Sequence, residues 1–125
     1  MSNPVGWFEI YVDDMDRAKA FYEKVFKTEL EAIGDLNDDN LTMVAFPSNM
    51  EKYGAAGALV KMAGFSAGGN STLVYFSCDD CAIEGERVTE AGGQVQQEKM
   101  SIGNYGFIIL ALDSEGNMFG LHSLK

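Results

Sequence analysis

The sequence predicts an α+β protein in which a βαβββ module occurs twice, so that two mixed sheets curve around a cup. Val12-Asp13-Asp14 ends an apolar strand and begins a helical run, and Cys78-Asp79-Asp80 does the same sixty-six residues later. Three strand-like segments then follow each helix in the same order, which is the mark of an internal repeat. We expect one domain over residues 1–125, with module one at 4–63, a connector at 64–71 and module two at 72–125.

In module one the spacing of apolar residues changes from strand to helix and back to strand. Trp7 to Val12 alternates and is rich in aromatic residues, as strands are. Asp13 and Asp14 supply an N-cap for a helix whose apolar residues recur every three to four positions. Further strands are predicted at 28–33, 41–46 and 57–62, with loops at 34–40 and 47–56.

Residues 64–71 are small and polar, which is typical of a flexible connector. Module two then repeats the plan, with a strand at 72–78 and a helix that Asp80 caps and Gly92-Gly93 ends. The remaining strands are predicted at 94–99, 107–112 and 118–123, and a loop at 101–106.

Composition bounds the class of protein. A chain of 125 residues with 46% hydrophobic residues is long enough to bury a core. Nine Lys and Arg stand against 19 Asp and Glu, a net charge of −10, so we expect neither nucleic acid nor an anionic membrane as a partner. No apolar run is long enough to span a membrane, and the N-terminus lacks a hydrophobic targeting segment. We expect a cytoplasmic protein.

The two cysteines, Cys78 and Cys81, have the spacing of a redox dithiol or of half a metal knuckle. No second Cys/His pair is available to complete a zinc site. We therefore expect both cysteines to pack as small apolar residues, one at an inward strand position and one in the first helical turn.

The predicted cup is defined by side-chain alternation, because successive strand residues point to opposite faces of a sheet. On the first strand Phe8, Ile10 and Val12 should pack under the helices, which leaves the other set for the concave face. The same division applies to the fifth and eighth strands. The residues expected to line the cup are Trp7, Glu9, Tyr11, Leu73, Tyr75, Ser77, Met118 and His122, joined by Ala58 and Val60 from the fourth strand.

The duplicated plan resembles the vicinal oxygen chelate superfamily, which includes glyoxalase I, extradiol dioxygenases, and fosfomycin- and bleomycin-resistance proteins. The resemblance covers nearly the whole chain and is specific for the fold, whereas one fold hosts many activities. The local matches are Phe8-Glu9-Ile10-Tyr11-Val12-Asp13-Asp14 followed by Arg17-Ala18 and Phe21-Tyr22, then Ala91-Gly92-Gly93, and Asp113-Ser114-Glu115-Gly116-Asn117.

The resemblance implies a divalent metal held by a His or Glu from each of the first, fourth, fifth and eighth strands. Those positions fall here on Trp7, Ala58, Leu73 and Gly120, none of which is a metal ligand. We therefore predict no cofactor, with a divalent metal as the alternative. The resemblance also implies a homodimer with its cups near the interface.

Glu9 and His122 are the candidate catalytic residues, because each lies two positions from an expected ligand, on the predicted concave face. A carboxylate in an aromatic cup suits a general base, and a nearby His can share its proton or bind a ligand. The alternative is that Glu9 and His122 only form hydrogen bonds with each other or with tyrosine hydroxyls and have no catalytic role. The predicted ligand-binding residues are Trp7, Glu9, Tyr11, Leu73, Tyr75, Met118 and His122.

Three functional hypotheses follow. The leading one is a glyoxalase-like protein that lacks the metal ligands and binds a small molecule in an aromatic-lined cup. The second is an enzyme, of lyase, isomerase or dioxygenase type, that uses a noncanonical metal site or Glu9 and His122 as an acid–base pair. The third is an interaction protein without a small ligand.

Overall fold

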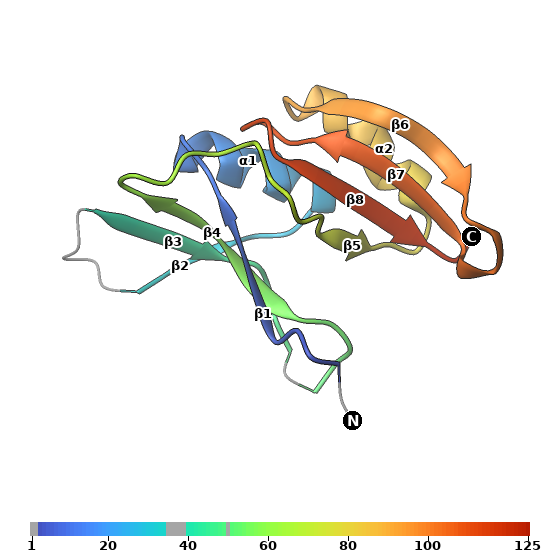
Figure 1. The fold of residues 1–125 in the computed structure, drawn as a ribbon, viewed down its shortest axis with the longest axis horizontal. Helices are drawn as coiled ribbons and strands as arrows, with labels where there is room; N and C mark the ends of the chain where they lie inside the picture. The colour runs from blue at the N-terminus through green and yellow to red at the C-terminus, as the bar shows by residue number, and fades with distance from the viewer. Residues whose placement is uncertain (1–2, 35–39, 50) are drawn as a thin grey trace.

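The computed structural model describes residues 3–34, 40–49 and 51–125, and in them two four-stranded mixed sheets lie in front of two α-helices (Figure 1). The predicted α+β duplication is confirmed, because both sheets have the same strand order and each follows a strand–helix–three-strand plan. The predicted loop at 34–40 lies largely outside the described residues.

In the first sheet the strands lie in the order β1-β4-β3-β2, with β1 parallel to β4 and the other pairs antiparallel. Asp14 caps the helix as predicted, since its side chain accepts a hydrogen bond from the backbone N–H of Arg17. The elements are β1 (Trp7–Tyr11), α1 (Met15–Phe26), β2 (Glu31–Ile33), β3 (Leu41–Ala45) and β4 (Ala56–Met62).

The second sheet repeats this arrangement in the order β5-β8-β7-β6, again with the first and last strands of the module parallel. Asp80 caps its helix by accepting a hydrogen bond from the N–H of Ala82. The elements are β5 (Tyr75–Ser77), α2 (Cys81–Glu90), β6 (Gln94–Ser101), a short 3₁₀ helix η1 (Gly103–Tyr105), β7 (Phe107–Leu112) and β8 (Met118–Ser123).

Two strands are at least three residues shorter than predicted, because side chains occupy the backbone groups that would have extended them. The strand predicted at 28–33 begins only at Glu31, since the N–H of Leu30 donates to the Glu23 carboxylate. The strand predicted at 72–78 is limited to β5. The Asn70 side chain bonds both the N–H and the carbonyl of Met118, so the first residue of β8 pairs with an amide side chain.

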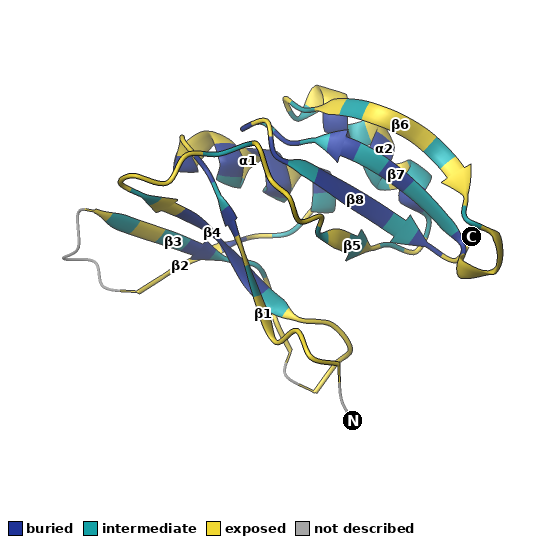
Figure 2. Cartoon of the chain, viewed as in Figure 1, coloured by how far each residue is buried: buried dark blue, intermediate teal, exposed yellow. Residues whose placement is uncertain are grey.

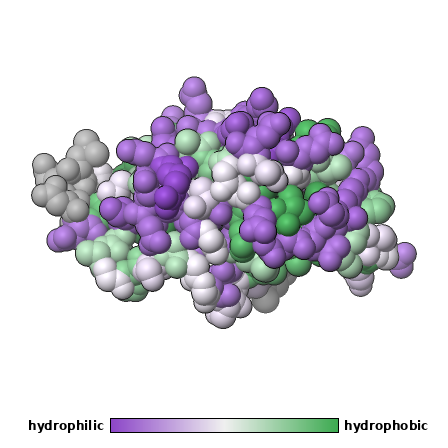
Figure 3. Space-filling model, turned by 90° about the horizontal axis from the view of Figure 1, so that it is seen from above, coloured by the Kyte–Doolittle hydropathy of each residue, from purple (hydrophilic) through white to green (hydrophobic). Residues whose placement is uncertain are grey.

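The core joins the two modules through aromatic residues. Tyr22 of α1 is fully buried, and its ring lies 5.4 Å from Phe46, 5.9 Å from Phe76 and 5.8 Å from Phe119. Phe76 and Phe119 belong to module two, so α1 packs across both sheets. Figure 2 shows buried residues concentrated on β4, β8 and the inner sides of the helices, and Figure 3 shows a mostly hydrophilic outer face with smaller hydrophobic areas.

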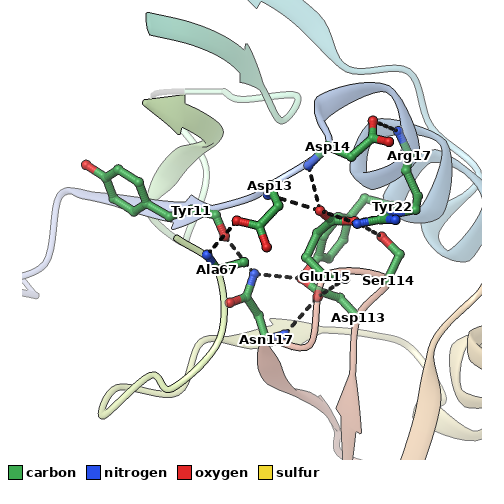
Figure 4. Close-up of polar contacts among 10 residues, drawn as sticks. All are labelled: Tyr11, Asp13, Asp14, Arg17, Tyr22, Ala67, Asp113, Ser114, Glu115 and Asn117. Atoms are coloured by element: carbon green, nitrogen blue, oxygen red, sulfur yellow. Dashed lines mark hydrogen bonds and ion pairs between the residues drawn. The ribbon is translucent and has the colours of Figure 1, made fainter. Parts of the chain in front are cut away.

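A second link between the modules is polar and centres on Glu115, whose side chain is fully buried in the turn between β7 and β8. Its carboxylate accepts hydrogen bonds from the backbone N–H groups of Asp13 (3.0 Å) and Asp14 (2.7 Å), at the start of α1. Arg17 donates to it from Nε (2.6 Å) and Nη2 (3.0 Å) (Figure 4). Module two thus places a buried anion beside the N-terminal end of the first helix, in addition to the Asp14 cap.

The same turn extends this link to β1. Buried Asp113 accepts a hydrogen bond from the Tyr22 hydroxyl (2.7 Å) and from the N–H groups of Glu115 and Asn117. The Asn117 side chain then donates to the carbonyl of Tyr11 (2.8 Å). Figure 4 shows the Tyr11 ring turned away from this inter-module cluster, which we define as Arg17, Tyr22, Asp113, Glu115 and Asn117. The cluster therefore holds the backbone of β1 in place at Tyr11.

The inter-module cluster should make the folded protein less stable in acid. Burial alone raises the pKa of Glu115, but hydrogen bonds from Arg17, Ser114 and two backbone amides outweigh it and lower the pKa from 4.5 to about 2. A carboxyl with a depressed pKa in the folded state stabilises the fold above its unfolded pKa, and this stability is lost as the pH falls through the window from about 4.5 to 2. The shift corresponds to about 3 kcal/mol.

Denaturant unfolding of the wild type at a series of pH values measures this loss. In Glu115→Gln the free energy of unfolding should depend less steeply on pH between about 4.5 and 2. An unchanged slope in that variant would contradict the assignment.

Candidate functional site

A cleft of about 700 Å³ lies between β1, the connector and the beginning of β8. Trp7, Glu9 and Tyr11 line it from the face of β1 that was predicted, and Trp7 is 43% exposed. Phe8 and Ile10, which were expected only to pack under the helices, contact the core and also border the cleft. The strand pairing places Ala58 beside Glu9 and Val60 beside Tyr11, in parallel register. Ala58 and Val60, which were expected to join the cup, are both buried and are not among the described residues that line the cleft.

Trp7, Glu9 and Tyr11 form one hydrogen-bonded unit on the wall of the cleft. The indole Nε1 of Trp7 donates to Glu9 Oε2 (3.1 Å), and the Tyr11 hydroxyl donates to Glu9 Oε1 (2.9 Å). The hydrogen bond to Glu9, with partial burial and the negative charge of that carboxylate, raises the pKa of Tyr11. The hydroxyl therefore remains a donor at neutral pH and keeps the carboxylate oriented.

The cleft gathers four of the seven predicted ligand-binding residues, namely Trp7, Glu9, Tyr11 and Met118. Leu73, Tyr75 and His122 are not among the described residues that line it. Leu73 precedes β5 and is 38% exposed. Tyr75 lies against Gly120 on the neighbouring strand, where an added Cβ would come within 2.2 Å of its ring.

Sequence reasoning missed that the connector lines the cleft, with Phe65 and Asn70 as its largest lining residues. Phe65 places its ring 5.5 Å from that of Tyr11, and Asn70 bridges to Met118. The signal available in the sequence was an isolated aromatic residue, in Gly64-Phe65-Ser66, within a small and polar segment. In the structure Phe65 is 56% exposed. The connector is also held by hydrogen bonds from Ala67 to Asp13 and from Gly68 to Asn117, more firmly than its composition predicted.

His122 and Glu9 each have other partners, and no hydrogen bond or ion pair joins these two described side chains. The Nε2 atom of His122 lies 2.7 Å from the carbonyl oxygen of Tyr105 in η1. Because a carbonyl only accepts, Nε2 carries a proton, which leaves Nδ1 as the acceptor of the neutral ring. The catalytic roles of Glu9 and His122 stay predictions.

The four family metal positions do not fit a divalent ion. Trp7, Ala58, Leu73 and Gly120 carry no metal-binding side chain, and the Tyr75 ring covers Gly120. Among the described residues there is also no group of three or more His, Cys, Asp or Glu placed to hold a metal ion. We therefore derive no chemical step through a metal at these four positions.

The two cysteines are free and lie against the core. Cys81 is fully buried at the start of α2, as predicted for a small apolar residue. Burial, followed by the charge of Glu84 and a hydrogen bond with it, raises the pKa of Cys78 to about 12. The thiolate, which is the reactive form, is thus strongly disfavoured at Cys78.

No helix among residues 3–34, 40–49 and 51–125 is long and apolar enough to cross a membrane. The family model that matches residues 5–121 is described as the Glyoxalase/Bleomycin resistance protein/Dioxygenase superfamily. No curated protein matches the chain.

Solved structures with this fold include a glyoxalase I variant from Zea mays, with a TM-score of 0.76 and 22% identity over 97% of this chain and 46% of that one. A Glyoxalase/Bleomycin resistance protein/Dioxygenase domain from Frankia has a TM-score of 0.71 and 14% identity over 98% of both chains. A family enzyme from Burkholderia phytofirmans has a TM-score of 0.67 and 15% identity over 96% of this chain and 98% of that one. This chain thus spans less than half the length of the maize protein, and the low identities establish the fold alone.

Proposed function

Because the chain belongs to the Glyoxalase/Bleomycin resistance protein/Dioxygenase superfamily, we propose that it binds a small organic molecule in the cleft, without a metal at the family's four ligand positions. The observation that supports this is a hollow of about 700 Å³ whose wall carries the bonded unit Trp7, Glu9 and Tyr11. Its size is typical of small-molecule pockets, and a few oriented polar groups on an aromatic wall are typical of their lining.

A thermal-shift screen of uncharged, cationic and anionic metabolites tests this proposal. A ligand that binds only the folded state at a hundredfold excess over its Kd adds about 2.7 kcal/mol of stability. Trp7 is the single tryptophan of the sequence, so its fluorescence should change with the same compounds. If no compound raises the melting temperature and none changes the fluorescence of Trp7, the interaction-protein hypothesis is favoured instead.

The enzymatic alternative has a separate test. Elemental analysis of the purified protein that finds stoichiometric zinc, nickel, iron or manganese would favour a noncanonical metal enzyme. For an acid–base pair, Glu9→Gln and His122→Asn should each reduce turnover of a compound found in the screen.

We also propose a homodimer in the cytoplasm. Alternation on β7 places Ile108, Leu110 and Leu112 on the side of the second sheet away from the core, and all three are only partly buried. A second copy that covered them would remove this apolar surface from water. Sedimentation at several concentrations measures the assembly, and a monomer at every concentration would contradict it.

A further inference from the structure

We propose that the cleft takes an organic cation, an ammonium group carried on an apolar or aromatic body, and that Glu9 is its anionic partner. This inference rests on the proposed small-molecule function and adds the chemical class of the ligand. It is carried by three observations: the way Glu9 is held, the aromatic rings beside it and the charges around the cleft.

The Glu9 carboxylate is oriented but not neutralised. Each of its oxygens receives one hydrogen bond, from the Trp7 indole N–H or the Tyr11 hydroxyl, and a carboxylate oxygen has room for a second. The ion pairs among the described residues engage Glu23, Asp80 and Glu115, and none engages Glu9. The free acceptor positions can therefore receive the N–H groups of an ammonium ion, in charge-assisted hydrogen bonds.

Aromatic rings flank this carboxylate on the wall of the cleft. Trp7 is 43% exposed and Phe65 is 56% exposed, and the Phe65 ring lies 5.5 Å from the Tyr11 ring at an angle of 31°. The faces of such rings attract a cation through their quadrupole, and Trp does so most strongly. One group on a ligand can thus contact the carboxylate and the rings together, while its apolar part lies against Met118 and Val74.

The charges around the cleft also favour a cationic ligand. Glu9 is the one charged side chain among the described lining residues, and the polar neighbours such as Asn70, Ser66 and Thr72 are neutral. No Lys or Arg among the described residues lines the cleft to receive an anion. The net charge of −10 adds a long-range repulsion of anions and attraction of cations. A neutral ligand that covered Glu9 would bury an unpaired charge, which is costly.

Three probes of similar size test the inference: 2-phenylethylamine, 2-phenylethanol and 3-phenylpropanoate, which differ mainly in charge. Titration is followed by the fluorescence of Trp7, the single tryptophan, and by the melting temperature. The amine should bind at least about tenfold more tightly than the alcohol, as expected for a charge-assisted hydrogen bond. High salt should weaken the amine more than the alcohol. The carboxylate should bind most weakly.

Glu9→Gln should abolish the preference for the amine, because glutamine carries no charge. Its amide oxygen still accepts from the Trp7 indole N–H, and its amide N–H can donate to the Tyr11 hydroxyl. Glu31→Gln is the matched control, since it removes the same charge from β2, at the opposite edge of the same sheet. Circular dichroism and melting confirm that both variants fold.

Each outcome decides between the two proposals. Alcohol or carboxylate binding as tightly as the amine, or an equal loss in both variants, overturns the cation inference and leaves the proposed function standing. A protein that does not respond to the amine also overturns the inference, and the wider metabolite screen then judges the proposed function.

Discussion

Replacing Glu115 with alanine should lower the free energy of unfolding by about 3 kcal/mol. The change removes a fully buried carboxylate that satisfies two backbone N–H groups at the start of α1 and pairs with Arg17. The two backbone N–H groups just before α1 would lose their acceptor, and the negative charge that Glu115 places beside this helix end would be lost, while the Asp14 cap would remain. Urea unfolding monitored by circular dichroism measures the loss.

Arg17→Ala is the informative comparison, because it removes the partner cation and leaves the backbone bonds to Glu115 in place. The Arg17 side chain is 54% exposed, so its ion pair is partly screened and its loss should cost only about 1 kcal/mol. Equal losses in the two variants would mean that the ion pair, and not the hydrogen bonds from the backbone N–H groups of Asp13 and Asp14, supplies the stability. A loss below about 0.5 kcal/mol in Glu115→Ala would contradict the role of the inter-module cluster.

Side-chain alternation predicted the faces of the strands because it depends only on the period of the backbone. Phe8 and Ile10 pack on the core side and Trp7 lies exposed, as the sequence of β1 indicated. The helix caps Asp14 and Asp80 were predictable for a similar reason, since an N-cap is a local hydrogen bond. Strand faces and helix caps could be predicted because each depends on a single segment of the sequence.

Contacts between distant segments could not be predicted in this way. Asp113 to Asn117 has the composition of an exposed turn, yet Glu115 is buried against backbone amides about a hundred residues away. Likewise the cleft joins β1 to Phe65 and Met118, which are far apart in the sequence. Which of these segments meet depends on packing between the modules, which no local pattern encodes. Leu73, Tyr75 and His122 have the strand positions expected of cup residues but are not among the described residues that line the cleft.

Close packing between the modules also makes one glycine indispensable. A Cβ atom on Gly93 would lie 2.3 Å from the carbonyl oxygen of Leu112 and 2.6 Å from the Phe21 ring. Leu112 belongs to β7 of module two, and Phe21, 1% exposed, belongs to α1 of module one. The added methyl group would therefore push a backbone segment and a core ring apart, and neither has free space to enter.

Gly93→Ala should lower the free energy of unfolding by about 3 kcal/mol, the upper end of the cost of overpacking a core. Gly6→Ala is the control: nothing lies within 4 Å of its added Cβ, and its stability should stay within about 0.5 kcal/mol of the wild type. Because Phe21 also packs against Phe119, beside the cleft, the Gly93 variant should bind any cleft ligand more weakly even where it is fully folded. Wild-type stability and affinity in Gly93→Ala would show that the modules shift freely against each other, so that packing at this contact does not set the geometry of the cleft.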